Sequence, residues 1–225
     1  MNFLAITMEE LPSVFMRLGE GMLTTFQIFF LTFVLSLPLG LIVAFGRMSK
    51  NAIIRNITKL YISVMRGTPL MLQIIVVFFG PNLIFGLSVS TNYRLPATII
   101  AFVINYAAYF AEIYRGGIES MEKGQYEAAD ILGFSKSQTF IRIILPQVIK
   151  RVLPSITNEA ITLVKDTSLA FTISVTEMFT AAERIAAAET SMVPYAVAAV
   201  FYYIFNYVVA FAMERIEKSF NYYKS

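Results

Sequence analysis

The sequence predicts an all-α integral membrane protein with five transmembrane helices, its N-terminus outside and its C-terminus in the cytoplasm. The first observation behind this is composition: 57% of the 225 residues are hydrophobic, 15% are charged, and mean hydropathy is +0.65. The second is a series of long uncharged segments, and the third is the distribution of lysine and arginine between them. Soluble domains of this length do not combine these properties.

The N-terminal segment, residues 1–21, carries mostly acidic charge. It contains Glu9, Glu10 and Glu20 and a single basic residue, Arg17. A cleaved signal peptide has a basic start, so this charge pattern argues against one. We expect an amphipathic segment that lies on the membrane.

Three spans follow from the uncharged segments. Between Glu20 and Arg47 lie 26 uncharged residues, more than the roughly 20 that cross a bilayer core, which predicts a first span over 22–46. The second span is predicted over 57–79, and Gly67 and Pro69 within it indicate a locally broken helix. The third is predicted over 95–114, where 17 residues from position 95 carry no charge.

The fourth span, predicted over 155–175, contains Glu159, Lys165 and Asp166. Each such charge near a helix centre costs about 2.5–3.5 kcal/mol, so composition alone would not select it. The last span, over 190–213, contains 24 uncharged residues.

The distribution of basic residues decides in favour of five spans. With the N-terminus outside, 13 of the 18 lysines and arginines fall on one side, in segments 47–59, 115–151 and 215–225, and only three fall on the other. Without the fourth span, the basic C-terminus would lie outside. The excess of basic residues in cytoplasmic segments therefore predicts the stated orientation.

The longest cytoplasmic segment, about 117–150, has helix boundaries of its own. Gly133 is suited to a left-handed helix end, and Ser135 with Gln138 forms a capping-box pattern for a second helix. Pro146 predicts that this second helix ends near position 145. The segment therefore reads as a short helix, a sharp turn and another short helix, which fits either a groove on another protein or a solvated connector.

The same segment carries Glu-Ala-Ala at 127–129, glycine at 133 and Ile-Leu-Pro at 144–146. This pattern resembles the EAA motif of permease subunits of ATP-binding-cassette (ABC) importers. The stretches RGTPLMLQ (66–73) and KDTSLAF (165–171) resemble the branch of that family that imports polar amino acids.

The resemblance extends over about residues 20–215 and implies a transmembrane domain at 22–215 with a cytoplasmic tail at 216–225. It implies a multi-pass protein of the bacterial cytoplasmic (inner) membrane that imports an amino acid, of cationic or cystine type. The expected partners are a cytoplasmic ATPase dimer, a second permease subunit (the same chain or a sister chain) and an extracytoplasmic binding protein. We expect no nucleic-acid partner.

The resemblance also assigns the loop helix a role in coupling to the ATPase, through Glu127, Ala128, Ala129 and Gly133. The chain has no G-x-x-x-x-G-K-[ST] phosphate loop, so ATP and magnesium belong to the partner ATPase. It has no histidine and no cysteine. This excludes catalysis by an imidazole or a thiolate and excludes metal ligation by either group. We therefore expect no catalytic residue, no metal site and no enzymatic activity in this chain.

The charges at membrane depth are the candidate substrate site. At 100° per residue, Glu159, Thr162 and Asp166 lie within about 60° of one another, and Asn158 and Lys165 adjoin them. This polar arc cannot face lipid cheaply. Both signs of charge suit a zwitterionic amino acid, but an internal set of ion pairs is the alternative interpretation.

Arg66 could bind a substrate carboxylate through two hydrogen bonds. It could instead pair with Asp166 or cap a helix end. Asn105 and Tyr109, one helical turn apart, could line the same cavity, although Asn105 also suits a hydrogen bond between helices. The candidate substrate-binding residues are Arg66, Asn158, Glu159, Thr162, Lys165 and Asp166.

Two other functions fit parts of the sequence. An ion-coupled secondary amino acid carrier would use the intramembrane charges but would leave the 127–146 segment without a role. A membrane scaffold or intramembrane enzyme is the other, and the absence of a nucleophile–base pair argues against the enzyme.

Overall fold

The structure, a computed structural model, describes residues 11–220, and within that range it contains helices and no strand. The α-helices are α1 (Leu11–Arg47), α2 (Ala52–Gly67), α3 (Leu70–Phe85), α4 (Arg94–Glu119), α5 (Lys123–Ile131), α6 (Lys136–Thr139), α7 (Leu145–Asp166), α8 (Met178–Glu189) and α9 (Val193–Ser219). Short turns of other helix types connect them: 3-10 helices η1 (Thr91–Tyr93) and η3 (Thr167–Ile173), and a π-helix η2 (Phe140–Ile144).

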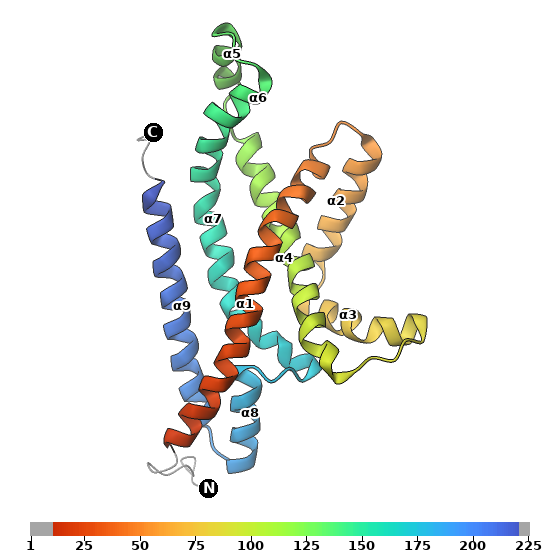
Figure 1. The fold of residues 1–225 in the computed structure, drawn as a ribbon, viewed down its shortest axis with the longest axis vertical. Coiled ribbons are helices and arrows are strands. Elements are labelled where there is room, and N and C mark those ends of the chain that lie inside the picture. Colours follow the sequence, from red (N-terminus) through yellow and green to blue (C-terminus); the bar gives the residue numbers. More distant parts are fainter. Residues whose placement is uncertain (1–10, 221–225) are drawn as a thin grey trace.

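Four long helices, α1, α4, α7 and α9, run along the long axis of the molecule (Figure 1). α5 and α6 lie at one end, which we call the α5 end, and α8 lies at the other, the α8 end. α1 starts at the α8 end, and α9 runs from there toward the α5 end. The segments that connect the long helices therefore lie at the two opposite ends of the molecule, as in a protein that crosses a membrane.

Length and apolarity qualify three segments as membrane spans within the described residues: α1, Thr91–Glu119 and α9. α2 and α3, of 16 residues each, qualify only together, and the 110° bend between them makes the pair one broken span or a re-entrant loop. The predicted fourth span corresponds to α7 and η3 and is too charged to qualify by composition. The structure thus confirms an all-α membrane protein, and the count of five spans and the orientation stay predictions.

The second span, predicted over 57–79 with a local break, corresponds to α2 and α3. The chain does not run straight: Thr68 is extended, with φ −120° and ψ 147°, and Pro69 precedes the first residue of α3. Proline disfavours a helical conformation in the residue before it. The predicted local break near Gly67 and Pro69 is confirmed.

α1 is one continuous helix from Leu11 to Arg47, and Pro38 does not end it. Part of the segment predicted to lie on the membrane, from Leu11 onward, is therefore helical and continuous with the first span. Residues 1–10, with Glu9 and Glu10, lie outside the described residues.

A row of small side chains brings α1 into close contact with its neighbours. Thr25, Thr32, Ser36 and Gly40 are all buried on this helix. At Gly40, an added Cβ would lie 2.8 Å from the Cβ of Phe110. Small residues that let helix backbones approach closely are the usual means of packing helices in membranes.

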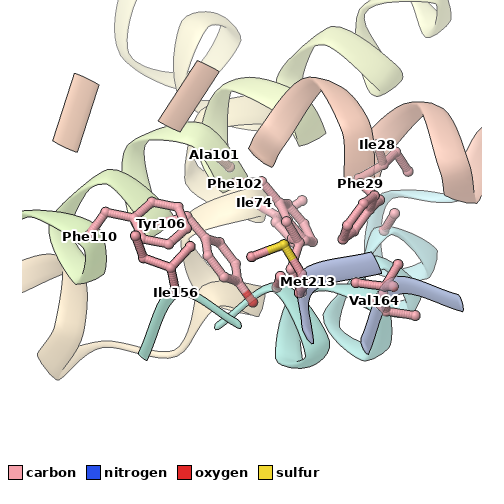
Figure 2. Packing of buried hydrophobic residues seen from close by; sticks show 14 of the residues in the cluster. Ile28, Phe29, Ile74, Ala101, Phe102, Tyr106, Phe110, Ile156, Val164 and Met213 are labelled. Atoms are coloured by element: carbon pink, nitrogen blue, oxygen red, sulfur yellow. The ribbon is translucent and has the colours of Figure 1, made fainter. Parts of the chain in front are cut away.

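The core lies between α1, α4, α7 and α9. Figure 2 shows Phe102, Tyr106 and Phe110 along α4, with the Tyr106 hydroxyl pointing toward α7. The rings of Phe29 and Phe205 join α1 to α9 edge to face, with centroids 5.3 Å apart. Such edge-to-face pairs add directional packing to apolar contact.

Glu177, fully buried, ties α8 to the long helices. Its carboxylate accepts hydrogen bonds from the backbone N–H groups of Phe179 and Thr180, each at 2.7 Å, and from the Tyr202 hydroxyl of α9 at 3.0 Å. Burial raises the pKa of the Glu177 carboxyl, although these hydrogen bonds oppose the shift. The carboxylate therefore caps the start of α8 and connects it to α9.

The predicted turn of the 127–146 segment is confirmed. Gly133 has φ +77°, and Phe134 N–H donates to the Ala129 carbonyl, as expected for a left-handed helix end. Ser135 and Gln138 form the capping box.

The predicted end of the second helix near position 145 is wrong. The chain stays helical through η2 into α7, and Pro146 lies in the first turn of α7. The proline removes one N–H donor, and the wider π-turn takes up the irregularity, with Leu145 N–H donating to the Phe140 carbonyl. The loop is therefore joined to α7 by continuous helix.

Candidate functional site

The corner between α2 and α3 is held by two amide side chains. Asn105 of α4 donates to the Met65 carbonyl and to Gln73 Oε1, both at 3.0 Å. Gln73 in turn donates to Met65 and Thr68. These bonds satisfy backbone carbonyls that the broken helix leaves without an intrahelical partner, and they confirm Asn105 as a link between helices.

Arg66, at the end of α2, points toward α4. Its guanidinium lies 5.2 Å from the centre of the Tyr109 ring and 4.0 Å from Glu112. Neither Asp166 nor a helix end is its partner in the described residues, so the two sequence-based alternatives for Arg66 give way to Glu112. The residue is exposed, so the rest of its guanidinium is open to another group.

Glu112 is the centre of a charge cluster that the sequence interpretation missed. Arg115 lies 2.6 Å away, Arg47 of α1 lies 3.9 Å away, and Arg66 completes the set. The Glu112 side chain is only 19% exposed. A carboxylate inside the predicted third span, which needs a nearby partner, was the signal that could have found it.

The inner edge of α7 carries the two carboxylates of the predicted site. Glu159 and Asp166 are half-buried. Asp166 Oδ2 accepts a hydrogen bond of 2.7 Å from the Tyr106 hydroxyl. Glu159 interacts electrostatically with Arg66 and Asp166, so the charges of α2 and α7 share one region.

The other edge of α7 is polar and exposed. It consists of Asn158, Thr162 and Lys165. No ion pair within 4.0 Å joins Lys165 to a carboxylate of residues 11–220. An ion pair between Lys165 and Glu159 or Asp166 is thus not formed in the described chain, and the exposed edge needs protein or water beside it.

The loop tip presents a second kind of surface. Glu127, Ala128 and Gly133 are exposed, whereas Ala129 is 1% exposed and packs inward. Two apolar side chains at the end of α5, Ile131 and Leu132, are 86% and 73% exposed. The sequence interpretation missed this apolar tip, and the adjacent glycine turn was its signal.

No cluster of three or more potential metal-ligating residues occurs within the part of the chain that the structure describes. The arrangement offers carboxylate, guanidinium and ammonium groups. Chemically it can bind a charged or zwitterionic solute.

Comparison with known proteins identifies the family. Residues 36–222 match the family described as binding-protein-dependent transport system inner membrane component. The chain belongs to this family. Among its relatives it is 36% identical over 208 residues to the L-cystine transport system permease protein TcyB of Bacillus subtilis, covering 92% of this chain and 87% of that protein. Within the family it is a permease of a type I ABC importer for polar amino acids.

Two further relatives agree. The probable amino-acid ABC transporter permease protein YckA of Bacillus subtilis is 38% identical over 219 residues, covering 97% of this chain and 93% of its own. The putative glutamine transport system permease protein GlnP of Rickettsia typhi is 33% identical over 201 residues, covering 88% and 90%.

Solved structures share the fold. The crystal structure of an amino acid ABC transporter with histidines superposes with a TM-score of 0.86 at 28% identity, over 95% of this chain and 99% of that one. The MetNI methionine ABC transporter in an inward-facing conformation superposes with a TM-score of 0.72 at 18% identity, over 96% and 100%, which is evidence for the fold alone.

Proposed function

We propose that this chain forms, as a dimer with itself or a sister chain, the substrate pathway of an ATP-driven importer for cystine or a cationic amino acid in the bacterial cytoplasmic (inner) membrane. The α5 end faces the cytoplasm, and the α8 end faces outward. A separate ATPase dimer supplies ATP hydrolysis with magnesium, and an extracytoplasmic binding protein delivers the amino acid. The family match over residues 36–222 is the observation that carries this proposal.

The loop tip couples the chain to the ATPase. The exposed side chains of Ile131 and Leu132 suit an apolar groove on another protein, and Glu127 and Ala128 lie on the same short helix. Because η2 joins α6, which follows the tip, to α7 without a break, a push on the tip is passed on to α7. α7 carries Glu159 and Asp166, so the push reaches the substrate site directly.

The substrate lies against Arg66, Glu159 and Asp166. Arg66 takes the α-carboxylate, and the two carboxylates take positive groups. A relative that transports L-cystine and a solved relative that contains histidines both support a substrate with more than one basic or ammonium group.

The exposed edge of α7, formed by Asn158, Thr162 and Lys165, faces the pathway shared with the second permease subunit. Exposed polar groups at membrane depth are costly against lipid, which supports a second chain or a water-filled pathway at this edge. The dimer then encloses the polar arc of each subunit.

An experiment on Gly133 tests the coupling. A valine there would be strained, because φ is +77° and β-branched residues tolerate this region poorly. In the assembled transporter, Gly133→Val is expected to lower substrate-stimulated ATP hydrolysis about tenfold or more, while the chain stays inserted. Gly124→Ala, where an added Cβ meets nothing within 4 Å, is the matched control and should hydrolyse ATP as the wild type does. Normal stimulated hydrolysis in Gly133→Val would contradict the coupling role.

A further inference from the structure

A polar pocket lies at the α8 end, away from the substrate site. It has a volume of about 310 Å³ and is lined by Thr24 of α1, by the η1–α4 junction (91, 92, 94 and 95) and by the 174–176 segment that leads to α8. These segments meet at one end of the molecule (Figure 1). Hydroxyl, amide and guanidinium groups dominate its walls, with Leu95 and Val175 as the apolar exceptions.

Arg94 gives this pocket a positive charge that forms no ion pair with the described part of the chain. It is half-buried at the first residue of α4, and no carboxylate of residues 11–220 lies within 4.0 Å of it. Its Nε is buried without a hydrogen-bond partner. An arginine is unfavourable at a helix N-terminus, where the helix dipole is already positive, so this arrangement favours a bound anion.

A second arginine adjoins the pocket. Arg184 of α8 donates to the hydroxyl of Thr176, a lining residue, at 3.1 Å. Only three basic residues are expected on the outer side, Arg17, Arg94 and Arg184, and two of them converge here. The pocket is therefore a local positive site on a face that has few basic groups.

The lining identifies the type of anion. It contains no carboxylate that could bind an ammonium group, so a zwitterionic amino acid would leave its ammonium unpaired. Binding pockets for small organic ligands are mostly apolar, and this one is mostly polar. Both features favour a carboxylate presented on a side chain of another protein.

We propose that this pocket receives an aspartate or glutamate side chain of the extracytoplasmic binding protein when that protein docks. The inference rests on the proposed function, which places the α8 end outside and requires a binding protein. Arg94 holds the carboxylate, and the hydroxyls of Thr24 and Thr91 surround it. Arg184 positions Thr176.

The test uses the assembled transporter in lipid nanodiscs, with the purified, substrate-loaded binding protein as the probe. ATP hydrolysis is measured against the concentration of binding protein. Arg94→Gln should raise the half-maximal concentration about fivefold to tenfold, and Arg94→Glu should raise it further. Arg94→Lys should give an intermediate value because it keeps the charge and loses the forked geometry. Hydrolysis without binding protein should match the wild type.

Arg17→Gln is the matched control, since it removes an exposed arginine from the same side without touching the pocket. The wild type provides a second measurement that needs no variant: the half-maximal concentration should rise between about 0.05 and 0.3 M salt, because salt screens the attraction between Arg94 and the approaching carboxylate.

An unchanged half-maximal concentration in Arg94→Glu, or no salt dependence in the wild type, would overturn the proposal. A lower maximal rate of ATP hydrolysis in Arg94→Gln at an unchanged half-maximal concentration would assign the pocket to a step after docking, which also overturns the proposal. If the wild type itself showed no stimulation by any binding protein, the proposed function would fail, and the docking partner with it.

Discussion

Glu112 shows how one side chain can hold three helices. It draws together Arg47 of α1, Arg66 of α2 and Arg115 of its own helix. Its side chain is largely shielded from water. In such a place, removing one charged partner lowers stability by more than the whole set of ion pairs contributes, because the remaining charges are left uncompensated. Without the Glu112 charge, Arg47 and Arg66 would lose their nearby counter-charge, and Arg115 would keep only its ion pair with Glu119.

We expect Glu112→Gln to destabilise the protein by about 1–3 kcal/mol, seen in detergent as a fall in the thermal midpoint of roughly 2–12 °C for a chain of this length. Glu119→Gln is the control. It also removes a carboxylate from Arg115, but the Glu119 side chain is 55% exposed, so its midpoint should change by less than about 2 °C. Equal shifts in the two variants would show that the cluster at Glu112 has no special role.

The two carboxylates of α7, Glu159 and Asp166, are expected to determine which substrate is transported. Glu159→Gln and Asp166→Asn keep the shape of each side chain and remove the charge that would bind a positive substrate group. Both should reduce uptake of a cationic amino acid about tenfold or change the preferred substrate, with expression unchanged. Glu183→Gln, at an exposed position of α8, should transport normally. Normal uptake with unchanged preference in both α7 variants would make the arc purely structural.

At the scale of elements, the packing of α1 against its neighbours requires glycine at some positions and not at others. At Gly40, an added Cβ would meet Phe110 Cβ at 2.8 Å and the Ala107 carbonyl oxygen at 3.0 Å. At Gly19, on the same helix, it would meet nothing within 4 Å. The close approach of α1 to α4 thus requires a glycine at position 40, whereas position 19 has room for a side chain.

Gly40→Leu should therefore separate α1 from α4 and cost about 1–3 kcal/mol or more, whereas Gly19→Leu should be close to neutral. The measurement is the fraction of each variant that elutes as a single species in detergent, together with its thermal midpoint. If Gly40→Leu were as stable as Gly19→Leu, this would contradict the close contact of α1 with α4 at position 40.

How far the sequence predicts this fold differs from element to element. Caps at Gly133 and Ser135 were predictable because each depends on a few adjacent residues. The continuation through Pro146 was not, because the π-turn that accommodates the proline is not visible in composition. Glu112 was missed for a similar reason, since its partners on α1 and α2 are distant in the sequence.

At the scale of the whole molecule, the two ends and the middle have separate tasks. The α5 end presents an apolar tip, the middle carries the charged arc, and the α8 end holds the polar pocket. α6, η2 and α7 form a continuous helix that begins just after the tip and reaches the middle. In the proposed function this connection converts ATPase movement into movement at the substrate site.

An ion-driven carrier and an ATP-driven importer would use different regions of this molecule. An ion-coupled carrier would need Glu159 and Asp166 as protonation or ion sites, and it would not need the loop tip. An ATP-driven importer needs both regions and a partner ATPase.

The most direct test is uptake of labelled amino acid by proteoliposomes that contain this chain with its ATPase and binding protein. We expect accumulation that requires enclosed ATP, persists when ionophores collapse all ion gradients, and is lost in Gly133→Val. Accumulation by the chain alone, driven by an ion gradient and independent of ATP, would contradict the account.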